Sequence, residues 1–179
     1  DEKIIGCGVT FGSTDMLIEG HEDYALEFGG DYLRVYYPKV VDSEIHLLLN
    51  CERESFSVGT ILLRDQEIPE YVCLVLTGLA ELLSMKEKTS YRLSSGSLIG
   101  DLAVLFGLKS KGTYRALSYI ETLKIPAVLF KEFVNRNQLM KQLQKTQETI
   151  EFLEQTWLFG ESISSPIQSQ IAQSITVKK

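Results

Sequence analysis

Glycine residues divide the centre of this chain into short apolar runs, and this pattern constrains the fold more than any other feature. Gly59, Gly78 and Gly96 lie 19 and 18 residues apart. The runs around them are rich in aliphatic, β-branched and aromatic residues, and each has a length suited to a strand. They are Phe56–Leu63, Tyr71–Thr77, Leu79–Met85, Ser90–Leu93, Thr113–Ala116 and Tyr119–Ile125. Successive antiparallel hairpins of this spacing wind into a barrel, so we predict a mainly β fold of the β-roll or jelly-roll type.

Helical spacing replaces this pattern after Pro126. Residues 127–158 contain neither glycine nor proline, and their apolar side chains recur every three or four residues. We predict two helices that pack on the roll, the second from about Asn137 to Leu158. Its seam alternates steps of four and three: Leu139, Leu143, Thr146, Ile150, Leu153 and Trp157. Two explanations stay open, a helix that covers the roll or a neighbouring domain, and a homodimer contact through residues 137–158.

The changes of pattern predict four segments of the chain. They are 1–42, a β-rich extension or a fragment of a neighbouring domain; 43–136, the roll; 137–158, the C-terminal helix; and 159–179, a flexible tail rich in serine. Within the first segment, residues 4–36 contain β-like runs separated by glycine turns. Asp42 or Ser43 is expected to cap a short helix that ends near Asn50.

Charge and cysteine content exclude several classes of protein. The chain has 179 residues and a net charge of −6, which argues against a general binder of nucleic acid or anionic membranes. No basic recognition helix follows Leu158, so DNA binding is not expected. Cys7, Cys51 and Cys73 are far apart and odd in number, as is typical of reduced thiols in a cytoplasmic protein. The sequence shows no apolar run long enough to span a membrane and no secretion leader.

The sequence offers no constellation for catalysis. His21 and His46 are its only histidines, and neither belongs to a zinc-binding motif. No serine lies in the strand-to-helix turn that exposes the nucleophile of many hydrolases. We therefore expect a protein that is not an enzyme and that has no resident metal or cofactor.

Residues 96–116 combine a glycine turn, a carboxylate, a short apolar segment and a basic loop. Gly100 permits a backbone conformation in which N–H groups approach a ligand, and Asp101 offers an acceptor to hydroxyl groups. Lys109 and Lys111 add local positive charge. This combination predicts a site for a phosphate group and a neighbouring sugar.

The order of these features resembles the cyclic-nucleotide-binding domain family, of the kind found in bacterial transcription regulators and protein kinase A regulatory subunits. The resemblance covers roughly residues 43–158. It rests on Phe56-Ser-Val-Gly-Thr-Ile-Leu-Leu63, Tyr71-Val-Cys-Leu-Val-Leu-Thr-Gly78, Leu98-Ile-Gly-Asp-Leu-Ala103 and Thr113-Tyr-Arg-Ala116. It implies a β-roll with a phosphate-binding cassette, closed by C-terminal helices.

The chain departs from the family at two positions of this cassette. The family has a Gly-Glu pair whose glutamate contacts the ribose 2′-hydroxyl, and here the pair is Gly100-Asp101. The arginine that holds the cyclic phosphate in the family corresponds to Ser110, which offers one neutral donor in place of a guanidinium. Losing a partner of such a charged contact costs about 2 to 5 kcal/mol, or roughly thirtyfold to several thousandfold in affinity.

Nearby groups are candidates to replace the missing arginine. Lys109 or Lys111 can act as a point charge, Thr113 adds a hydroxyl, and the backbone of residues 101–103 can donate N–H groups. Arg115 alternates with its neighbour in the predicted strand and points to the other face. The implied ligand site is Gly100, Asp101, Leu102, Ala103, Lys109, Ser110, Lys111 and Thr113.

Two functions follow from the resemblance. The first is a regulatory ligand-sensing module that binds a cyclic nucleotide, cAMP or cGMP, and signals through its C-terminal helices to an unknown effector. The second is a degenerate member of the family that no longer binds nucleotide and acts as a protein-interaction or dimerisation module. The residues of the cassette favour the first, and the loss of the arginine favours the second.

Overall fold

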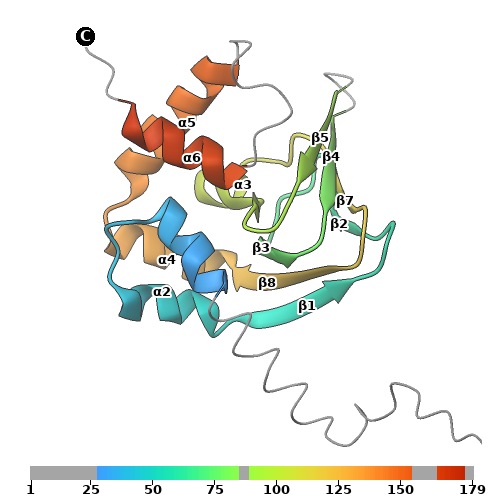
Figure 1. The fold of residues 1–179 in the computed structure, drawn as a ribbon, viewed down its shortest axis with the longest axis horizontal. Helices are drawn as coiled ribbons and strands as arrows, with labels where there is room; N and C mark the ends of the chain where they lie inside the picture. The colour runs from blue at the N-terminus through green and yellow to red at the C-terminus, as the bar shows by residue number, and fades with distance from the viewer. Residues whose placement is uncertain (1–27, 85–88, 155–164, 176–179) are drawn as a thin grey trace, which may run out of the picture.

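The computed structural model describes residues 28–84, 89–154 and 165–175. Its β-strands form two antiparallel sheets of four strands, with the orders β1-β8-β3-β6 and β2-β7-β4-β5. Figure 1 shows the two sheets as a roll, with the helices gathered at one side of it. The strands are β1 Glu52–Phe56, β2 Ile61–Leu63, β3 Tyr71–Thr77, β4 Ala80–Ser84, β5 Thr89–Leu93, β6 Leu98–Ile99, β7 Thr113–Ala116 and β8 Ile120–Pro126. The predicted fold class, a mainly β roll with helices, is confirmed.

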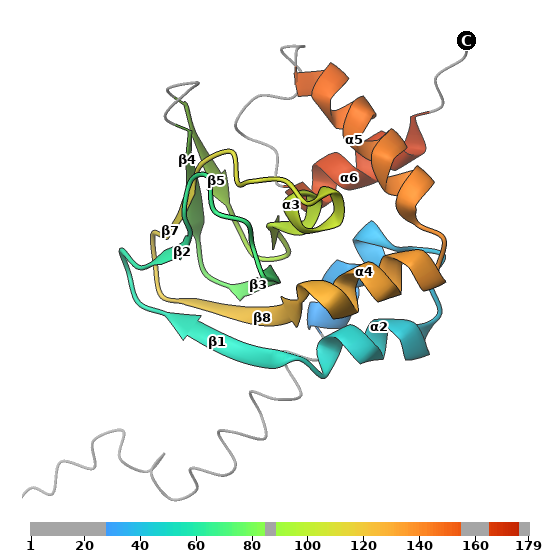
Figure 2. The same ribbon diagram turned by 180° about the vertical axis from the view of Figure 1, so that it is seen from behind.

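Helices precede, interrupt and follow the roll. They are α2 Asp42–Leu49, α3 Asp101–Phe106, α4 Ala127–Arg136, α5 Met140–Glu154 and α6 Ser165–Ser174, and residues 28–36 are helical as well. In Figures 1 and 2, α3 lies between the roll and the pair formed by α5 and α6. The two helices predicted after Pro126 are α4 and α5, with the second beginning a few residues later than expected because Gln138 adopts a left-handed backbone, φ 54°.

Buried side chains form two clusters on opposite faces of β3. Val72, Leu74 and Leu76 point toward the helices and belong to the first cluster, whereas Val75 points into the roll and belongs to the second. This alternation is the period of a strand that is buried on both faces. The first cluster also contains Leu33, Tyr36, Tyr37, Phe130 and Phe133, and the second also contains Leu63, Ala80, Ile99, Ala116 and Ile120.

Two details of the predicted strands differ from the structure. The run Phe56–Leu63 is not one strand, because the chain turns between β1 and β2, with Gly59 at φ 84°. The Gly59 N–H donates to the carbonyl oxygen of Ala116, which fixes this turn on β7. The short strand β6 was not predicted, since two residues give no measurable periodicity.

Residues 28–36 form a helix where β-like runs were predicted, so that prediction is wrong for this part of the N-terminal segment. Leu33, Tyr36 and Tyr37 are buried in the first cluster, and their spacing of three and four residues is helical. The preceding residues, 1–27, lie outside the described part of the chain.

The next helix, α2, lies where a short helix was predicted, but its cap is different. The N-cap is Val41, which has no side-chain capping bond. Asp42 accepts a hydrogen bond from Arg34 Nε at 3.0 Å, so its carboxylate joins two helices and does not cap one.

The helix α6 lies within the segment predicted as a flexible tail, so that prediction is wrong for residues 165–174. Ser169 and Ala172 are buried three residues apart, and α6 packs on α5. Gln173 Nε2 donates to the carbonyl oxygens of Val35 and Tyr36, at 3.4 and 3.1 Å. Residues 159–164 and 176–179 of the predicted tail lie outside the described residues.

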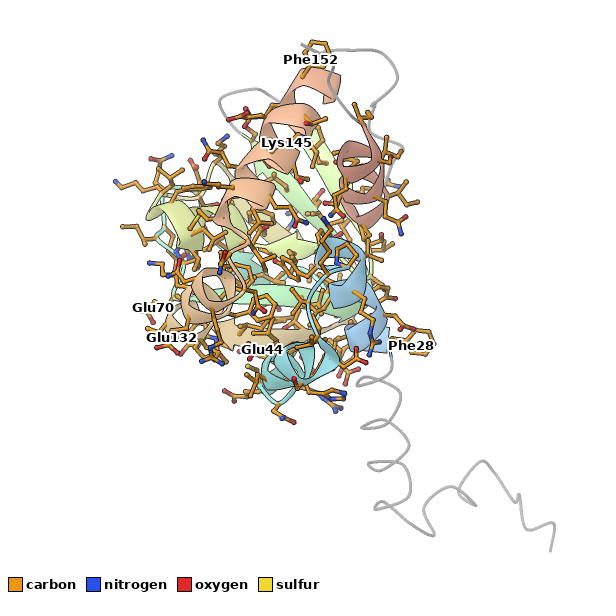
Figure 3. The ribbon with its side chains drawn as sticks, turned by 90° about the vertical axis from the view of Figure 1, so that its left-hand side faces the viewer. Phe28, Glu44, Glu70, Glu132, Lys145 and Phe152 are labelled. Carbon is orange, nitrogen blue, oxygen red and sulfur yellow. The ribbon has the colours of Figure 1, made fainter. Side chains whose placement is uncertain are left out.

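The seam of α5 packs within its own chain. Leu139 is buried in the first cluster, and Leu143 packs against it. Phe152 lies off this seam and is 66% exposed, and Figure 3 shows it at the far end of α5. The homodimer through residues 137–158 stays a prediction, and Trp157 lies outside the described residues.

No helix in the described part of the chain combines the length and the apolar character needed to cross a membrane.

Candidate ligand-binding cassette

The cassette begins with a glycine turn that only a residue without a side chain adopts easily. Gly100 joins β6 to α3 with a left-handed backbone, φ 85°. A Cβ atom at this position would lie 3.3 Å from the carbonyl oxygen of Tyr71 and 3.4 Å from Pro69. The left-handed backbone therefore favours glycine here, and the approach of the Tyr71 carbonyl oxygen leaves little space for a side chain.

Asp101 is the first residue of α3, and its side chain is half-buried. Burial raises the pKa of its carboxyl group to about 6, although hydrogen bonds from the N–H groups of Leu102 and of Asp101 itself act to lower it. Desolvation raises the pKa values of the Tyr36, Tyr37 and Tyr114 hydroxyl groups, and the charge of Asp101 adds a smaller effect in the same direction.

Leu102 and Ala103 complete the first turn of α3 and are half-buried. The N–H of Val104 donates to the carbonyl oxygen of Gly100 at 2.8 Å, which closes the turn. The N–H of Leu108 donates to the carbonyl oxygen of Ala103 at 2.8 Å and anchors the start of the basic loop on the helix. Backbone hydrogen bonds therefore connect the predicted residues 100–103 to the beginning of the loop.

Ser110 is buried, and its donors are already used. Its N–H donates to the carbonyl oxygen of Glu67 at 2.8 Å, and its Oγ donates to the carbonyl oxygen of Gly112 at 2.7 Å. Its own carbonyl oxygen accepts from the N–H of Gln66 at 3.1 Å. In this arrangement Ser110 closes a turn against the β2–β3 loop and offers no free donor to a ligand.

The other predicted residues of the basic loop differ in exposure. Lys109 and Lys111 are exposed, and neither forms an ion pair with a residue that the structure describes. Thr113 is half-buried, and its Oγ1 accepts a hydrogen bond from the N–H of Asp65 at 3.2 Å. Its hydroxyl hydrogen is thus still available for a second partner.

Arg115 lies on the outer face of the roll, as predicted from its alternation with Tyr114. Its guanidinium pairs with the carboxylate of Glu81, and its Nε donates to Glu81 Oε1 at 2.8 Å. Ser90 Oγ also lies 3.4 Å from the second oxygen of this carboxylate. The ion pair with Glu81 therefore holds Arg115 on the sheet, and Arg115 does not replace the missing arginine.

The sequence reasoning gave no role to Tyr36 or Tyr114, two of the three tyrosines on whose pKa values the charge of Asp101 acts. Tyr36 is buried, and its hydroxyl donates to the carbonyl oxygen of Gly96 at 2.9 Å. Tyr114 packs with the second cluster inside the roll. The strand alternation that predicted an outward Arg115 also predicts an inward Tyr114, whereas no local signal connects Tyr36 with the cassette.

The described residues include no group of three or more histidine, cysteine, aspartate or glutamate side chains that is placed to hold a metal ion. The predicted site residues include one carboxylate, that of Asp101, and the hydroxyl groups of Ser110 and Thr113. This donor set suits hydrogen bonding to a small polar molecule.

Comparisons with known proteins agree with this architecture. Residues 53–137 match the family model of the cyclic nucleotide-binding domain. No curated protein sequence gives a significant match. One similar solved structure is the regulatory subunit of a cAMP-independent protein kinase A from Trypanosoma cruzi bound to guanosine; the TM-score is 0.64 at 14% identity, and the match covers 83% of this chain and 52% of that chain.

Two further solved structures have the same fold. A triple mutant of the corresponding Trypanosoma brucei subunit, bound to cAMP in its A site, gives a TM-score of 0.65 at 13% identity over 87% of this chain and 55% of that chain. The regulatory domain of Toxoplasma gondii PKA with cAMP gives 0.59 at 16% identity over 83% and 57%. This chain spans about half the length of these structures. These structures share the fold of this chain, and the family model of the cyclic nucleotide-binding domain matches residues 53–137.

Proposed function

We propose that this chain contains a regulatory module that binds a ribose-bearing ligand at the cassette and acts by binding, without catalysis. The observation that carries the proposal is the half-buried carboxylate of Asp101 on the Gly100 turn. A carboxylate accepts hydrogen bonds from hydroxyl groups, and those hydroxyl groups are what a sugar supplies. The family of the domain makes cAMP and cGMP the first ligands to test.

A cyclic phosphate has no charged partner in the arrangement described here. Ser110 is neutral, and its N–H and Oγ–H already donate to Glu67 and Gly112. A phosphate diester would need Lys109 or Lys111 to turn toward it from the surface, which costs side-chain entropy. Cyclic-nucleotide binding is therefore expected to be weaker than in a domain that has the arginine.

A neutral nucleoside is the second candidate ligand, because it needs no charge at position 110. The solved relative bound to guanosine is described as cAMP-independent. The relative bound to cAMP is a mutant in which one threonine is replaced by arginine, among three changes. These descriptions support testing guanosine beside cAMP as a ligand of this chain.

The helices after the roll are suited to transmit occupancy. The cassette helix α3 contacts α4, and the N–H of Ala127 at the start of α4 donates to the carbonyl oxygen of Glu70 at 2.9 Å. A ligand changes this arrangement only if it binds one position of the helices more tightly than another. Signalling through α4 and α5 to an effector is part of the proposal.

Titration calorimetry of the protein with cAMP, cGMP, guanosine and adenosine tests the proposal. Binding should be lost in Asp101→Ala and kept in Glu132→Ala, because Glu132 is an exposed carboxylate of α4, labelled in Figure 3. Binding of nucleosides without cyclic nucleotides would identify the second ligand class. No binding of any of the four up to millimolar concentration would overturn the proposal and leave a fold kept for protein contacts.

A further inference from the structure

Three apolar side chains are exposed where two loops of the roll meet. Ile68 is 58% exposed in the β2–β3 loop, and Phe106 and Leu108, at the end of α3 and just after it, are 44% and 49% exposed. The N–H of Ser110 donates to the carbonyl oxygen of Glu67 at 2.8 Å, and this bond holds the two loops side by side. Single exposed apolar residues are normal, but three on adjoining loops form a surface that another group can cover.

Exposed cations border these apolar side chains. Arg64 in the β2–β3 loop, and Lys109 and Lys111 in the basic loop, form no ion pair with any residue that the structure describes. The carboxylates of the same loops have local partners: Asp65 accepts from the side chain of the next residue at 3.1 Å, and Glu67 accepts from the N–H of Arg64 at 3.0 Å. We call the three apolar residues and the three cations the loop surface. Its chemistry suits an acidic segment that also carries apolar side chains.

This chain contains such a segment among residues 1–27, which lie outside the described part of the structure. These residues include seven aspartates or glutamates and one lysine, a difference equal to the net charge of −6 of the whole chain. The rest of the chain is therefore electrically balanced. Within the segment, residues 16–18 are the apolar run Met-Leu-Ile, and carboxylates lie on both sides of the run at Asp15, Glu19, Glu22 and Asp23.

The segment is long enough to reach the loop surface. The described chain begins at Phe28, which Figure 3 labels, and Ile18 precedes it by ten positions. Ten residues of extended chain span about 33 Å, which is comparable with the width of a domain whose radius of gyration is about 15 Å. Covalent attachment also raises the local concentration of the segment, so weak contacts are sufficient for docking.

We infer that residues 15–23 of this chain dock on the loop surface. The apolar run 16–18 covers the three exposed apolar side chains, and the carboxylates on either side of it face the three cations. The apolar contact supplies most of the affinity, because exposed ion pairs contribute little, and the charges set the position of the segment. A docked segment also engages Lys109 and Lys111, so a ligand that needs either lysine competes with it.

Hydrogen exchange of the full chain, followed peptide by peptide with mass spectrometry, tests this inference. Lys109→Glu combined with Lys111→Glu reverses the charge of the loop surface and should speed amide exchange in residues 15–23 about fivefold. The control combines Lys141→Glu with Lys145→Glu, at two exposed lysines of α5, of which Lys145 is labelled in Figure 3. The control should leave the exchange of residues 15–23 unchanged.

An exchange of charges separates a direct contact from a change in folding. Asp15→Lys combined with Glu19→Lys should also reduce the protection of residues 15–23. Adding these two substitutions to the loop variant should restore the protection, because opposite charges face each other again. A loop variant that merely unfolds locally would not be rescued by substitutions in the segment.

Three results would overturn the inference. Equal exchange of residues 15–23 in the loop variant and in the α5 control would show that the loop surface is not the docking site. Protection that disappears on dilution would assign the docked segment to a second copy of the chain. Exchange in the unmodified protein as fast as in an unstructured peptide would mean that the segment does not dock, and would leave the loop surface for a separate acidic partner.

Discussion

The hydroxyl of Tyr36 donates a hydrogen bond of 2.9 Å to the carbonyl oxygen of Gly96, which lies 60 residues later in the chain. This bond joins the helix over residues 28–36 to the turn that precedes β6 and the cassette. A Cβ atom on Gly96 would lie 2.8 Å from Tyr32 and 3.0 Å from Pro166, so α6 meets the same turn. One small region thus connects the N-terminal helix, the C-terminal helix and the cassette.

Replacing Tyr36 with phenylalanine should weaken this connection. The substitution removes a buried hydrogen bond and leaves the Gly96 carbonyl without its partner, which costs about 1 to 2 kcal/mol of unfolding free energy. Urea unfolding of Tyr36→Phe and of the exposed control Tyr119→Phe measures the difference. Equal midpoints for the two variants would show that water replaces the bond without loss.

Gly78 and Gly59 form a matched pair that separates backbone strain from crowding. Both have left-handed backbones, φ 94° and 84°. A Cβ atom at Gly59 meets nothing within 4 Å, whereas one at Gly78 would overlap the carbonyl oxygen of Tyr119. Gly59→Ala should cost about 1 to 2 kcal/mol from strain alone, and Gly78→Ala should cost about 1 to 3 kcal/mol more because the neighbouring turn must move. Thermal unfolding of both variants is the measurement, and similar melting temperatures would contradict the steric argument.

Asp101 should make the stability of the domain without ligand depend on pH. Its pKa is about 6 in the folded chain, against an ordinary value of 3.8, so the folded state holds the proton more tightly than the unfolded state. The stabilising effect is complete below pH about 4 and is lost as the pH rises through about 6, with a size of about 3 kcal/mol.

The variant Asp101→Asn tests this dependence because it cannot ionise. It should flatten the pH profile of the unfolding free energy between pH 4 and 7, while Glu132→Gln, on an exposed side chain, should leave the slope unchanged. A slope that persists in Asp101→Asn would assign the effect to another group.

Much of the roll could be predicted because its strands carry local signals. The bounds of β3 and β7 coincide with the apolar runs Tyr71–Thr77 and Thr113–Ala116, each of which ends at a change in composition. The Gly100 turn was predictable for the same reason, since its left-handed backbone needs a residue without a side chain. These features depend on residues close together in the sequence.

The surroundings of the cassette depend on distant residues and could not be predicted in this way. Burial, and then the charge of Asp101, raises the pKa of Tyr36, which lies on a helix about 65 positions before Asp101 in the chain. The N–H of Ser110 donates to the carbonyl oxygen of Glu67 in the β2–β3 loop, so a tertiary contact makes this donor unavailable to a ligand. The short helix α6 has a serine- and glutamine-rich sequence with little helical preference, and its contacts with Val35 and Tyr36 supply the missing stability.

Gln173 is the residue whose removal should release α6. Its side-chain amide donates to the carbonyl oxygens of Val35 and Tyr36, at the end of the helix over residues 28–36. Gln173→Ala should speed amide hydrogen exchange in residues 165–174 about fivefold to tenfold, which corresponds to a loss of roughly 1 kcal/mol. The exposed neighbour Gln170 provides the control variant Gln170→Ala. Equal exchange in the two variants would mean that packing of Ala172 alone holds the helix.

Ser110→Arg should shift ligand preference toward the cyclic phosphate. A guanidinium at this position offers paired charged donors to the phosphate oxygens, and cAMP binding should strengthen by tenfold or more. The substitution also breaks the bond from Ser110 Oγ to Gly112 and must turn a long side chain out of a buried site, so the unfolding free energy should fall by about 1 kcal/mol or more. Lys111→Arg is the control, since it adds a guanidinium to the same loop from an exposed position and keeps the turn. Calorimetry with cAMP on both variants is the measurement. Stronger binding in Ser110→Arg alone would assign the phosphate position to residue 110, whereas equally stronger binding in both variants would assign the effect to the charge of the loop. If cAMP binding is stronger in neither variant, the pocket does not admit the cyclic phosphate.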